Sequence, residues 1–290
     1  MKVGYAGLGA MGGPMAMNLA KHFDTVVWNR TTSRAEAHAA EHGSTVASSF
    51  AEIADVDVLC TCLPTDVEVK AFAEQVAPQM RDGAVWLDHT SGASAGSREI
   101  AELLAPHGVR YLDAPVSGGT AGAEAGKLTV MIGGDEGALD EVRGVLDAVA
   151  ASVVHVGPVG AGMAVKAVNN ALMSTSLWAA SEGLAALKAA GVESTKALEV
   201  INSSSGRSFA TETLIANNVV TRKFTPTFAI ELMAKDVKLA TSVLDDAGVD
   251  GKVIRLVEEL NWAAVAEVGE GVSHTSVAKV VENQSGVEIS

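Results

Sequence analysis

Short apolar runs alternate with helical patterns through the first 160 residues, and this alternation constrains the fold more than any other feature. The runs KVGYAGLG (2–9) and VDVLCTCL (56–63) are typical of buried strands, and a helical pattern follows each. Strands separated by helices form βαβ crossovers, so the pattern predicts a mostly parallel sheet. Because the runs are almost entirely apolar, we expect helices to cover both faces of that sheet.

The strand pattern stops after the glycines of residues 157–162. From Met163 to Gly191 the chain contains no proline, which predicts one helix roughly 40 Å long. Every later periodic segment is also helical in pattern, including 195–202, 231–248 and 251–269. We therefore expect two domains, residues 1–162 and residues 163–290, the second all-helical and joined to the first by the long interdomain helix.

Charge and hydropathy exclude several classes of protein. The chain has 21 Lys and Arg against 35 Asp and Glu, a net charge of −14, and no basic run. Nucleic-acid binding needs clustered Lys and Arg, so we expect no nucleic-acid partner. No apolar run is long enough to span a membrane, and glycines and a proline interrupt the apolar N-terminal segment. We expect a cytoplasmic protein without a membrane partner.

The two cysteines, Cys60 and Cys62, lie in the strand-like segment DVLCTCLP. At positions i and i+2 of a strand they point to the same face, like two small apolar residues. The alternative is half of a C-x-C metal site, but no second cysteine pair or histidine pair accompanies it, and zinc sites need a full ligand set. We therefore expect no metal.

Gly7, Gly9 and Gly12 form a G-x-G-x-x-G motif between the first strand and the first helical pattern. The intervening residues are Leu8, Ala10 and Met11. In this context the glycines permit a tight turn and close approach of the backbone to a pyrophosphate, which the helix N-terminus then binds. The motif predicts a dinucleotide site in a Rossmann-type, doubly wound, mostly parallel sheet.

The end of the second strand indicates which dinucleotide binds. An NAD site places a carboxylate here to bind the ribose 2′-hydroxyl, but this chain has Asn29, Arg30 and Thr31, with no carboxylate before Glu36. An arginine suits a 2′-phosphate through charge-assisted pairing. The alternative is a solvated surface arginine. We expect NADP, and NAD is the less favoured cofactor.

Two further motifs carry polar groups. Ser117, Gly118 and Gly119 follow a strand in DAPVSGGTAGAEAG, where successive N–H groups can bind an anion; the alternative is a plain loop. Lys166 and Asn170 lie at i and i+4 in an otherwise apolar helical pattern. Buried polar groups are costly unless paired, so these residues indicate function, and a lysine held there can act as an acid or base.

The four blocks GLGAMGGPMAMNL, DAPVSGGTAGAEAGKLTVMIGG, GPVGAGMAVKAVNN and FTPTFAIELMAKDVKLA occur in this order and span nearly the whole chain. Together they resemble the successive signatures of the β-hydroxyacid dehydrogenases. SLWAASEGLAAL and INSSSGRS resemble the 3-hydroxyisobutyrate dehydrogenase branch, and WNRT resembles its NADP-using members. Members of this family are usually homodimers or homotetramers.

The resemblance implies roles by position. Lys166 matches the catalytic lysine, and the family more often has Ser-Thr where this chain has Thr90-Ser91, so the acting hydroxyl stays open. The implied substrate-binding residues are Ser91, Ser117, Gly118, Gly119 and Asn170. The implied cofactor-binding residues are Gly7, Leu8, Gly9, Ala10, Met11, Gly12, Asn29, Arg30, Thr31, Leu63, Pro64, Ser91, Lys235 and Asp236.

The implied reaction is NADP-dependent oxidation of a short β-hydroxy acid, most simply 3-hydroxyisobutyrate to methylmalonate semialdehyde. The apolar surroundings of Met173 and Trp178 suit a methyl branch, and Arg207 is either a second cationic group or a solvated loop residue. One alternative is an NADPH-dependent reductase of glyoxylate, succinic semialdehyde or tartronate semialdehyde. The other is a non-catalytic dinucleotide-binding module, against which the intact lysine, asparagine and Ser-Gly-Gly loop argue.

Overall fold

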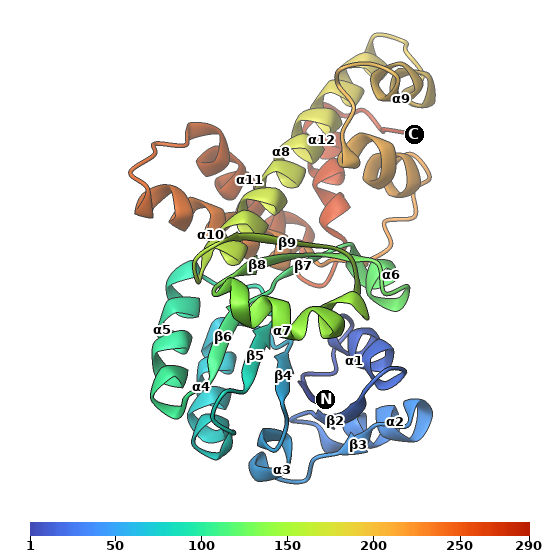
Figure 1. Cartoon of the computed structure of the whole chain (residues 1–290). Coiled ribbons are helices and arrows are strands. Elements are labelled where there is room, and N and C mark those ends of the chain that lie inside the picture. Colours follow the sequence, from blue (N-terminus) through green and yellow to red (C-terminus); the bar gives the residue numbers. More distant parts are fainter. The chain divides into compact units, whose positions relative to one another are not determined.

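Nine strands form one sheet within residues 2–157 of the computed structural model, which describes residues 1–290 (Figure 1). The strands are β1 Lys2–Ala6, β2 Asp24–Trp28, β3 Thr45–Val46, β4 Val58–Thr61, β5 Val85–Asp88, β6 Arg110–Asp113, β7 Val116–Ser117, β8 Leu128–Gly133 and β9 Ala150–Gly157. The order β3-β2-β1-β4-β5-β6 is parallel throughout, whereas β8 is antiparallel to β6 and β7 and parallel to β9. This strand order is that of a doubly wound sheet, so the predicted Rossmann-type fold is confirmed.

Each face of the sheet has its own core, because successive side chains of a strand point to opposite faces. Cys60 and Leu87 belong to one core, and their neighbours Leu59 and Trp86 belong to the other. The helices over the first core are α1 Gly12–Ala20, α2 Thr32–His42, α6 Gly119–Glu124 and α7 Glu136–Asp147. The helices over the second core are α3 Phe50–Ala54, α4 Asp66–Val76 and α5 Ser94–Leu104. The expectation that helices cover both faces is therefore confirmed.

The segment 109–119, which leads into the Ser-Gly-Gly loop, is not one continuous strand. It forms two short strands, β6 and β7, which are separated by Ala114 and Pro115 and both pair with β8. Proline has no N–H to donate to a neighbouring strand, so the ladder is interrupted where Pro115 stands. The interruption turns the chain at the point where the Ser-Gly-Gly loop begins.

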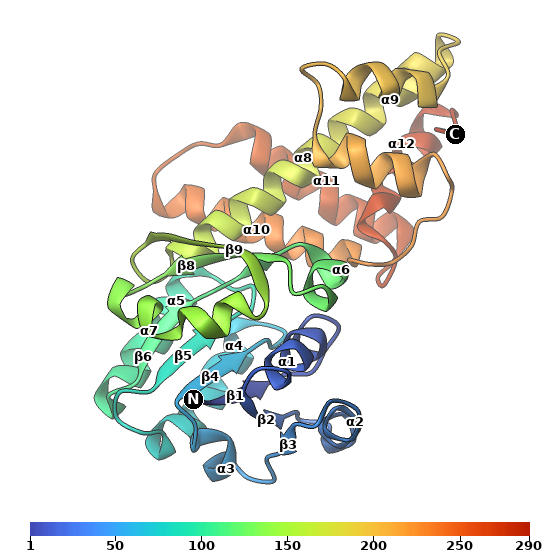
Figure 2. The same ribbon diagram turned by 45° about the vertical axis from the view of Figure 1, so that its right-hand side comes forward.

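The second half of the chain is helical. Its helices are α8 Ala161–Ala189, α9 Ser194–Asn202, α10 Ile230–Asp246, α11 Lys252–Val268 and α12 Val277–Ser285, with a π-helical segment at Ala210–Val219. Both views show α8 as one continuous helix (Figures 1 and 2), and its 29 residues make it about 44 Å long. None of the helices combines the length and apolarity needed to cross a membrane.

The chain divides into unit 1, Met1–Lys166, and unit 2, Ala167–Ser290, and the division falls inside α8. Unit 2 has its own apolar core, which includes Trp178 and has Met173 packed against it. The apolar character around these two side chains is therefore that of a helical core. It gives no support to the interpretation of this stretch as a pocket for a methyl branch.

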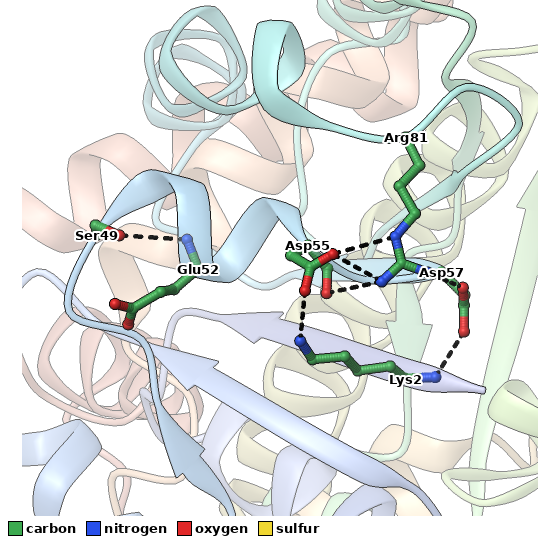
Figure 3. Close-up of polar contacts among 6 residues, drawn as sticks. All are labelled: Lys2, Ser49, Glu52, Asp55, Asp57 and Arg81. Carbon is green, nitrogen blue, oxygen red and sulfur yellow. Dashed lines mark hydrogen bonds and ion pairs between the residues drawn. The ribbon is translucent and has the colours of Figure 1, made fainter.

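The amino ends of β1, β4 and β5 meet in a group of exposed charges that we call the amino-edge cluster: Lys2, Asp55, Asp57 and Arg81 (Figure 3). Lys2 Nζ lies 3.0 Å from Asp55 Oδ2, and the Lys2 main-chain N–H donates to Asp57 Oδ2 at 2.8 Å. Arg81 bridges the two carboxylates, with Nη2 at 2.8 Å from Asp55 Oδ1 and Nη1 at 2.7 Å from Asp57 Oδ1. The cluster joins three strands at the edge opposite the glycine-rich loop.

Candidate active site

The glycine-rich loop, residues 7–11, joins β1 to α1 and is fastened to the end of β2. The Gly7 N–H donates to the Trp28 carbonyl at 3.0 Å, and the Leu8 N–H donates to Asn29 Oδ1 at 3.0 Å. Asn29 Nδ2 in turn donates to the Thr31 carbonyl at 3.0 Å. The Asn29 amide therefore holds the loop against the end of β2. The sequence did not predict this structural role.

The three glycines of the motif differ in their surroundings. A Cβ on Gly7 would lie 2.2 Å from the Cys62 carbonyl oxygen, and a Cβ on Gly12 would lie 2.0 Å from the Gly7 carbonyl oxygen. Backbone packing therefore requires glycine at both positions. A Cβ on Gly9 would meet no heavy atom within 4 Å, and Met11 provides no side-chain cap for α1. Open space beside an uncapped helix start fits a pyrophosphate.

Arg30 and Thr31 follow β2 and lead into α2, and both are exposed. The helix has no acidic residue in its first turn and no side-chain cap from Thr31. The Thr65 hydroxyl and, more weakly, the Arg30 charge lower the pKa of Glu68. A cation beside an uncapped helix start has the chemistry to bind an anionic group.

Leu63 and Pro64 follow β4, and Thr90 and Ser91 lie just beyond β5. The Leu63 N–H donates to Thr90 Oγ1 at 3.0 Å, and Thr90 is buried. The Thr90 hydroxyl is also a hydrogen-bond partner of the Asp88 carboxylate. The Thr90 hydroxyl is thus engaged by protein groups, and the neighbouring Ser91 is half-buried.

A buried polar network, which the sequence did not reveal, supports these strand ends. Asp88 Oδ1 accepts from the Thr61 hydroxyl at 2.8 Å and from the Thr90 N–H at 3.1 Å. Asp88 Oδ2 accepts from the Tyr111 hydroxyl at 2.9 Å. Burial raises the pKa of Asp88, and these hydrogen bonds lower it. Burial is the larger effect, so the pKa is raised to about 6. One carboxylate thus connects the carboxyl ends of β4 and β5 with the Tyr111 side chain of β6.

Ser117 ends β7, and Gly118 and Gly119 lead into α6. Gly118 (φ 135°) and Gly119 (φ 63°) have positive φ values, a backbone conformation that favours glycine. The far end of α6 is held by Asn18 of α1, whose Nδ2 donates to the Ala123 carbonyl at 2.8 Å. The predicted substrate loop is therefore attached to the same helix that begins at the glycine-rich loop.

Helix α8 carries Lys166 and, one turn later, Asn170. Within unit 2, Asn170 Nδ2 donates to Asp236 Oδ2 at 2.7 Å, and Lys235 Nζ lies 3.7 Å from Asp236 Oδ1. Asp236 is buried, and its Oδ1 accepts no hydrogen bond. The structure thus brings together three of the predicted residues, Asn170, Lys235 and Asp236. A buried carboxylate oxygen that has an ion-pair partner at 3.7 Å but no hydrogen bond is costly.

Arg207 has a surface position in unit 2. Its side chain is 64% exposed, and Nη1 lies 3.6 Å from Glu212 Oε1. Of the two interpretations that the sequence left open, this position favours the solvated loop residue.

Comparison with known proteins identifies the class to which this arrangement belongs. The model for the NAD binding domain of 6-phosphogluconate dehydrogenase matches residues 2–157, and the model for the NAD-binding domain of NADP-dependent 3-hydroxyisobutyrate dehydrogenase matches residues 160–281. A 2-(hydroxymethyl)glutarate dehydrogenase from Eubacterium barkeri is 34% identical over 309 aligned positions, covering 100% of this chain and 98% of the relative. An NAD-dependent L-serine dehydrogenase from Pseudomonas aeruginosa is 33% identical, covering 82% and 84% of the two chains.

Among solved structures, the 3-hydroxyisobutyrate dehydrogenase of Mycobacterium tuberculosis with L-serine is similar over 97% of this chain and 98% of its own. The TM-score is 0.90 and the sequence identity 29%. The fold and these matches define an oxidoreductase that acts on CH–OH groups with a nicotinamide dinucleotide. The chain belongs to the β-hydroxyacid dehydrogenase family.

Proposed function

We propose that the protein oxidises 3-hydroxyisobutyrate to methylmalonate semialdehyde with NADP. The observation that carries the proposal is helix α8, which presents Lys166 and then Asn170 one turn later, beside the Asp236 carboxylate. The M. tuberculosis 3-hydroxyisobutyrate dehydrogenase, with its similar fold, supports this substrate. The substrate is a short acid with one carboxylate, which suits the single glycine loop at Ser117–Gly119.

In the proposed reaction Lys166 Nζ takes the proton of the substrate hydroxyl and returns it when the aldehyde is reduced. A nicotinamide dinucleotide held by the glycine-rich loop would supply the hydride acceptor for this oxidation. The N–H groups of Ser117–Gly119 bind the substrate carboxylate, and the Ser91 hydroxyl and Asn170 amide orient the rest of the molecule. We further propose that Lys235 and Asp236 take part in cofactor binding.

The NADP preference rests on the start of α2. Arg30 pairs with the 2′-phosphate in our proposal, while Asn29 keeps the adjoining loop in place through Leu8. A hydrogen bond to a charged group is worth about 1.5–3 kcal/mol, which corresponds to roughly ten- to a hundredfold in kcat/KM. Arg30→Ala is expected to remove most of the preference. A wild-type enzyme that uses NAD equally well would contradict it.

The test of the reaction is Lys166→Ala. General acid–base catalysis contributes about a hundredfold or more, so kcat is expected to fall by at least that factor, with little change in cofactor affinity. Lys238→Ala, which removes an exposed lysine of α10, is the matched control and is expected to leave turnover unchanged. Near-normal turnover by Lys166→Ala would refute the role of Lys166.

The substrate is tested with 3-hydroxyisobutyrate, 3-hydroxypropionate, L-serine, glycerate, 4-hydroxybutyrate and 2-(hydroxymethyl)glutarate. Aldehyde reduction is assayed with glyoxylate, succinic semialdehyde and tartronate semialdehyde. L-serine is the second candidate, because the M. tuberculosis structure was obtained with it and the P. aeruginosa relative is named for it. The solvated position of Arg207 disfavours a dicarboxylate. A tenfold higher kcat/KM for any compound other than 3-hydroxyisobutyrate would replace the proposed substrate, and turnover of none would favour a non-catalytic module.

A further inference from the structure

Asp113, the last residue of β6, is a fully buried carboxylate whose partners are main-chain N–H groups. Oδ1 accepts from the Gly160 N–H at 2.7 Å, and Oδ2 accepts from the Met163 N–H at 2.9 Å. The Gly162 N–H is a further partner. These groups belong to the start of α8, so a side chain of the sheet holds the first turn of the longest helix.

The carboxylate lies in a socket that two glycines make possible. A Cβ on Gly133 would lie 2.4 Å from Asp113 Oδ1, and a Cβ on Gly162 would lie 2.8 Å from Asp113 Oδ2. Either contact would push the carboxylate from its place. The carboxylate therefore depends on glycine at both positions, and its hydrogen bonds hold the start of α8 against β6.

Asp113 also lies between two parts of the proposed site. Lys166 follows Met163 by three residues on α8, and Ser117 follows Asp113 by four residues along the chain. We propose that Asp113 is a positioning residue for the proton transfer: it fixes the helix that carries Lys166 against the strand that leads to the substrate loop. The inference rests on the proposed role of Lys166.

The physical reason is the sensitivity of proton transfer to distance. A carboxylate at a helix N-terminus forms charge-assisted hydrogen bonds and interacts favourably with the helix dipole. Without them, the first turn of α8 is free to shift, and a displacement of about 1 Å of a reacting group lowers rates by roughly a hundredfold. A residue that only stabilised the fold would change the free energy of unfolding and leave the turnover of folded enzyme intact.

The test is a double-mutant cycle of Asp113→Asn with Lys166→Ala. The asparagine has nearly the same shape, but it carries no charge and its Nδ2 cannot accept an N–H. We expect Asp113→Asn alone to lower kcat ten- to a hundredfold, to leave the KM for NADP within twofold of wild type and to increase the solvent deuterium isotope effect on kcat. In the Lys166→Ala background the same change is expected to lower kcat less than threefold, because residues that act through one group are not additive.

The matched control is Asp135→Asn. Asp135 caps α7 through its Oδ1, which accepts the Ala138 N–H at 2.8 Å, but α7 carries no proposed site residue. The control is expected to keep wild-type kcat and isotope effect. A folded Asp113→Asn enzyme with wild-type kcat, or with an equal loss in both backgrounds, would overturn the inference while leaving the role of Lys166 untouched.

If Asp113→Asn does not fold, Asp113→Ser enters the same cycle, since its shorter side chain keeps an acceptor and leaves room in the socket. If neither variant folds, Asp113 is a requirement of folding and the inference is overturned. Normal turnover by Lys166→Ala is a separate outcome. It would refute the proposed function itself, and the inference would fall with it.

Discussion

The two edges of the sheet in unit 1 use carboxylates in opposite ways. At the carboxyl edge, Asp88 and Asp113 are buried and accept hydrogen bonds from hydroxyl and main-chain N–H groups. At the amino edge, Asp55 and Asp57 are exposed and pair with Lys2 and Arg81 (Figure 3). Burial raises the pKa of both Asp88 and Asp113, whereas the bonds from Lys2 and Arg81 lower the pKa of Asp55.

The difference shows at which edge of the sheet the fold tolerates the free-energy cost of burying carboxylates. A buried carboxylate with neutral partners is expensive, but it fixes geometry because few alternative partners exist. Exposed ion pairs cost little and contribute little. The costly groups lie at the edge that carries the glycine-rich loop, Ser91 and the start of α8, where small displacements affect function.

The largest expected effect comes from Gly12→Ala. The added Cβ would lie 2.0 Å from the Gly7 carbonyl oxygen, so the glycine-rich loop must move. We expect a loss of unfolding free energy of about 3 kcal/mol and at least a tenfold rise in the KM for NADP. Gly13→Ala is the matched control, since its Cβ would meet only the Leu8 carbonyl at 3.8 Å. Equal behaviour of the two variants would contradict the packing argument.

The next effect is a pH dependence that distinguishes the two edges. Folding raises the Asp88 pKa from 3.8 to about 6, so its stabilising contribution is complete below pH 3.8 and is lost as pH rises to about 6. The loss amounts to about 3 kcal/mol. Folding lowers the Asp55 pKa, so its contribution is present above the ordinary pKa and is lost as pH falls.

Urea unfolding between pH 4 and pH 7 measures this dependence. Asp88→Asn is expected to reduce the fall in unfolding free energy over that range to the part that Asp113 contributes, and Asp55→Asn is expected to leave the fall unchanged. If wild type and Asp88→Asn show the same slope, Asp88 is ionised in the fold at all these pH values and the contrast between the edges is wrong.

A smaller effect separates the two neighbouring hydroxyls. Thr90→Val leaves the Leu63 N–H without its acceptor, which is expected to cost about 1–3 kcal/mol of unfolding free energy and to raise the KM for NADP severalfold. Thr90→Ser keeps the hydroxyl and is the control. Ser91→Ala is expected to preserve stability and to lower kcat/KM for the hydroxy acid. The opposite pattern would assign the ligand-facing role to Thr90.

The smallest effect is expected at the amino edge. Arg81→Ala removes two ion pairs whose members are partly exposed, so the free energy of unfolding is expected to change by less than about 1 kcal/mol, and less still in high salt. Turnover is expected to stay at the wild-type value. A fall in kcat would show that the amino-edge cluster is coupled to the site.

The sequence predicted those features whose physical cause is local. Gly12 is required by packing within the loop itself, and the alternation of strands and helices indicated the sheet. Gly7 was recognised from the motif alone, because the contact that requires glycine there is with the Cys62 carbonyl, far along the chain. The π-helical segment Ala210–Val219 and the short β3 were not predicted, because neither has a distinct periodic pattern.

Asp88 and Asp113 were missed because their partners lie far away along the chain. Each follows a leucine at the end of its strand, in WLD and YLD, and the sheet register makes them neighbours. The repeated Leu-Asp ending indicates that the two strands carry similar residues at their ends. That the two carboxylates are neighbours follows only from the pairing of β5 with β6. Asn29 was predicted for the cofactor from its position, and the structure shows that its amide supports the loop from β2. Almost any residue can supply a main-chain N–H, so the sequence does not reveal which residues are bound in this way.

The raised pKa values of the two cysteine thiols have a practical consequence. Burial raises the pKa of the Cys62 thiol to about 12 and that of Cys60 further, so neither forms appreciable thiolate at neutral pH. Alkylating dyes and spin labels are therefore expected to react slowly with the native chain at neutral pH. Val67 of α4 is 71% exposed and lies three residues after Pro64. A fluorophore attached through Val67→Cys would thus report from one position on binding at the neighbouring strand end, with no need to remove either native cysteine.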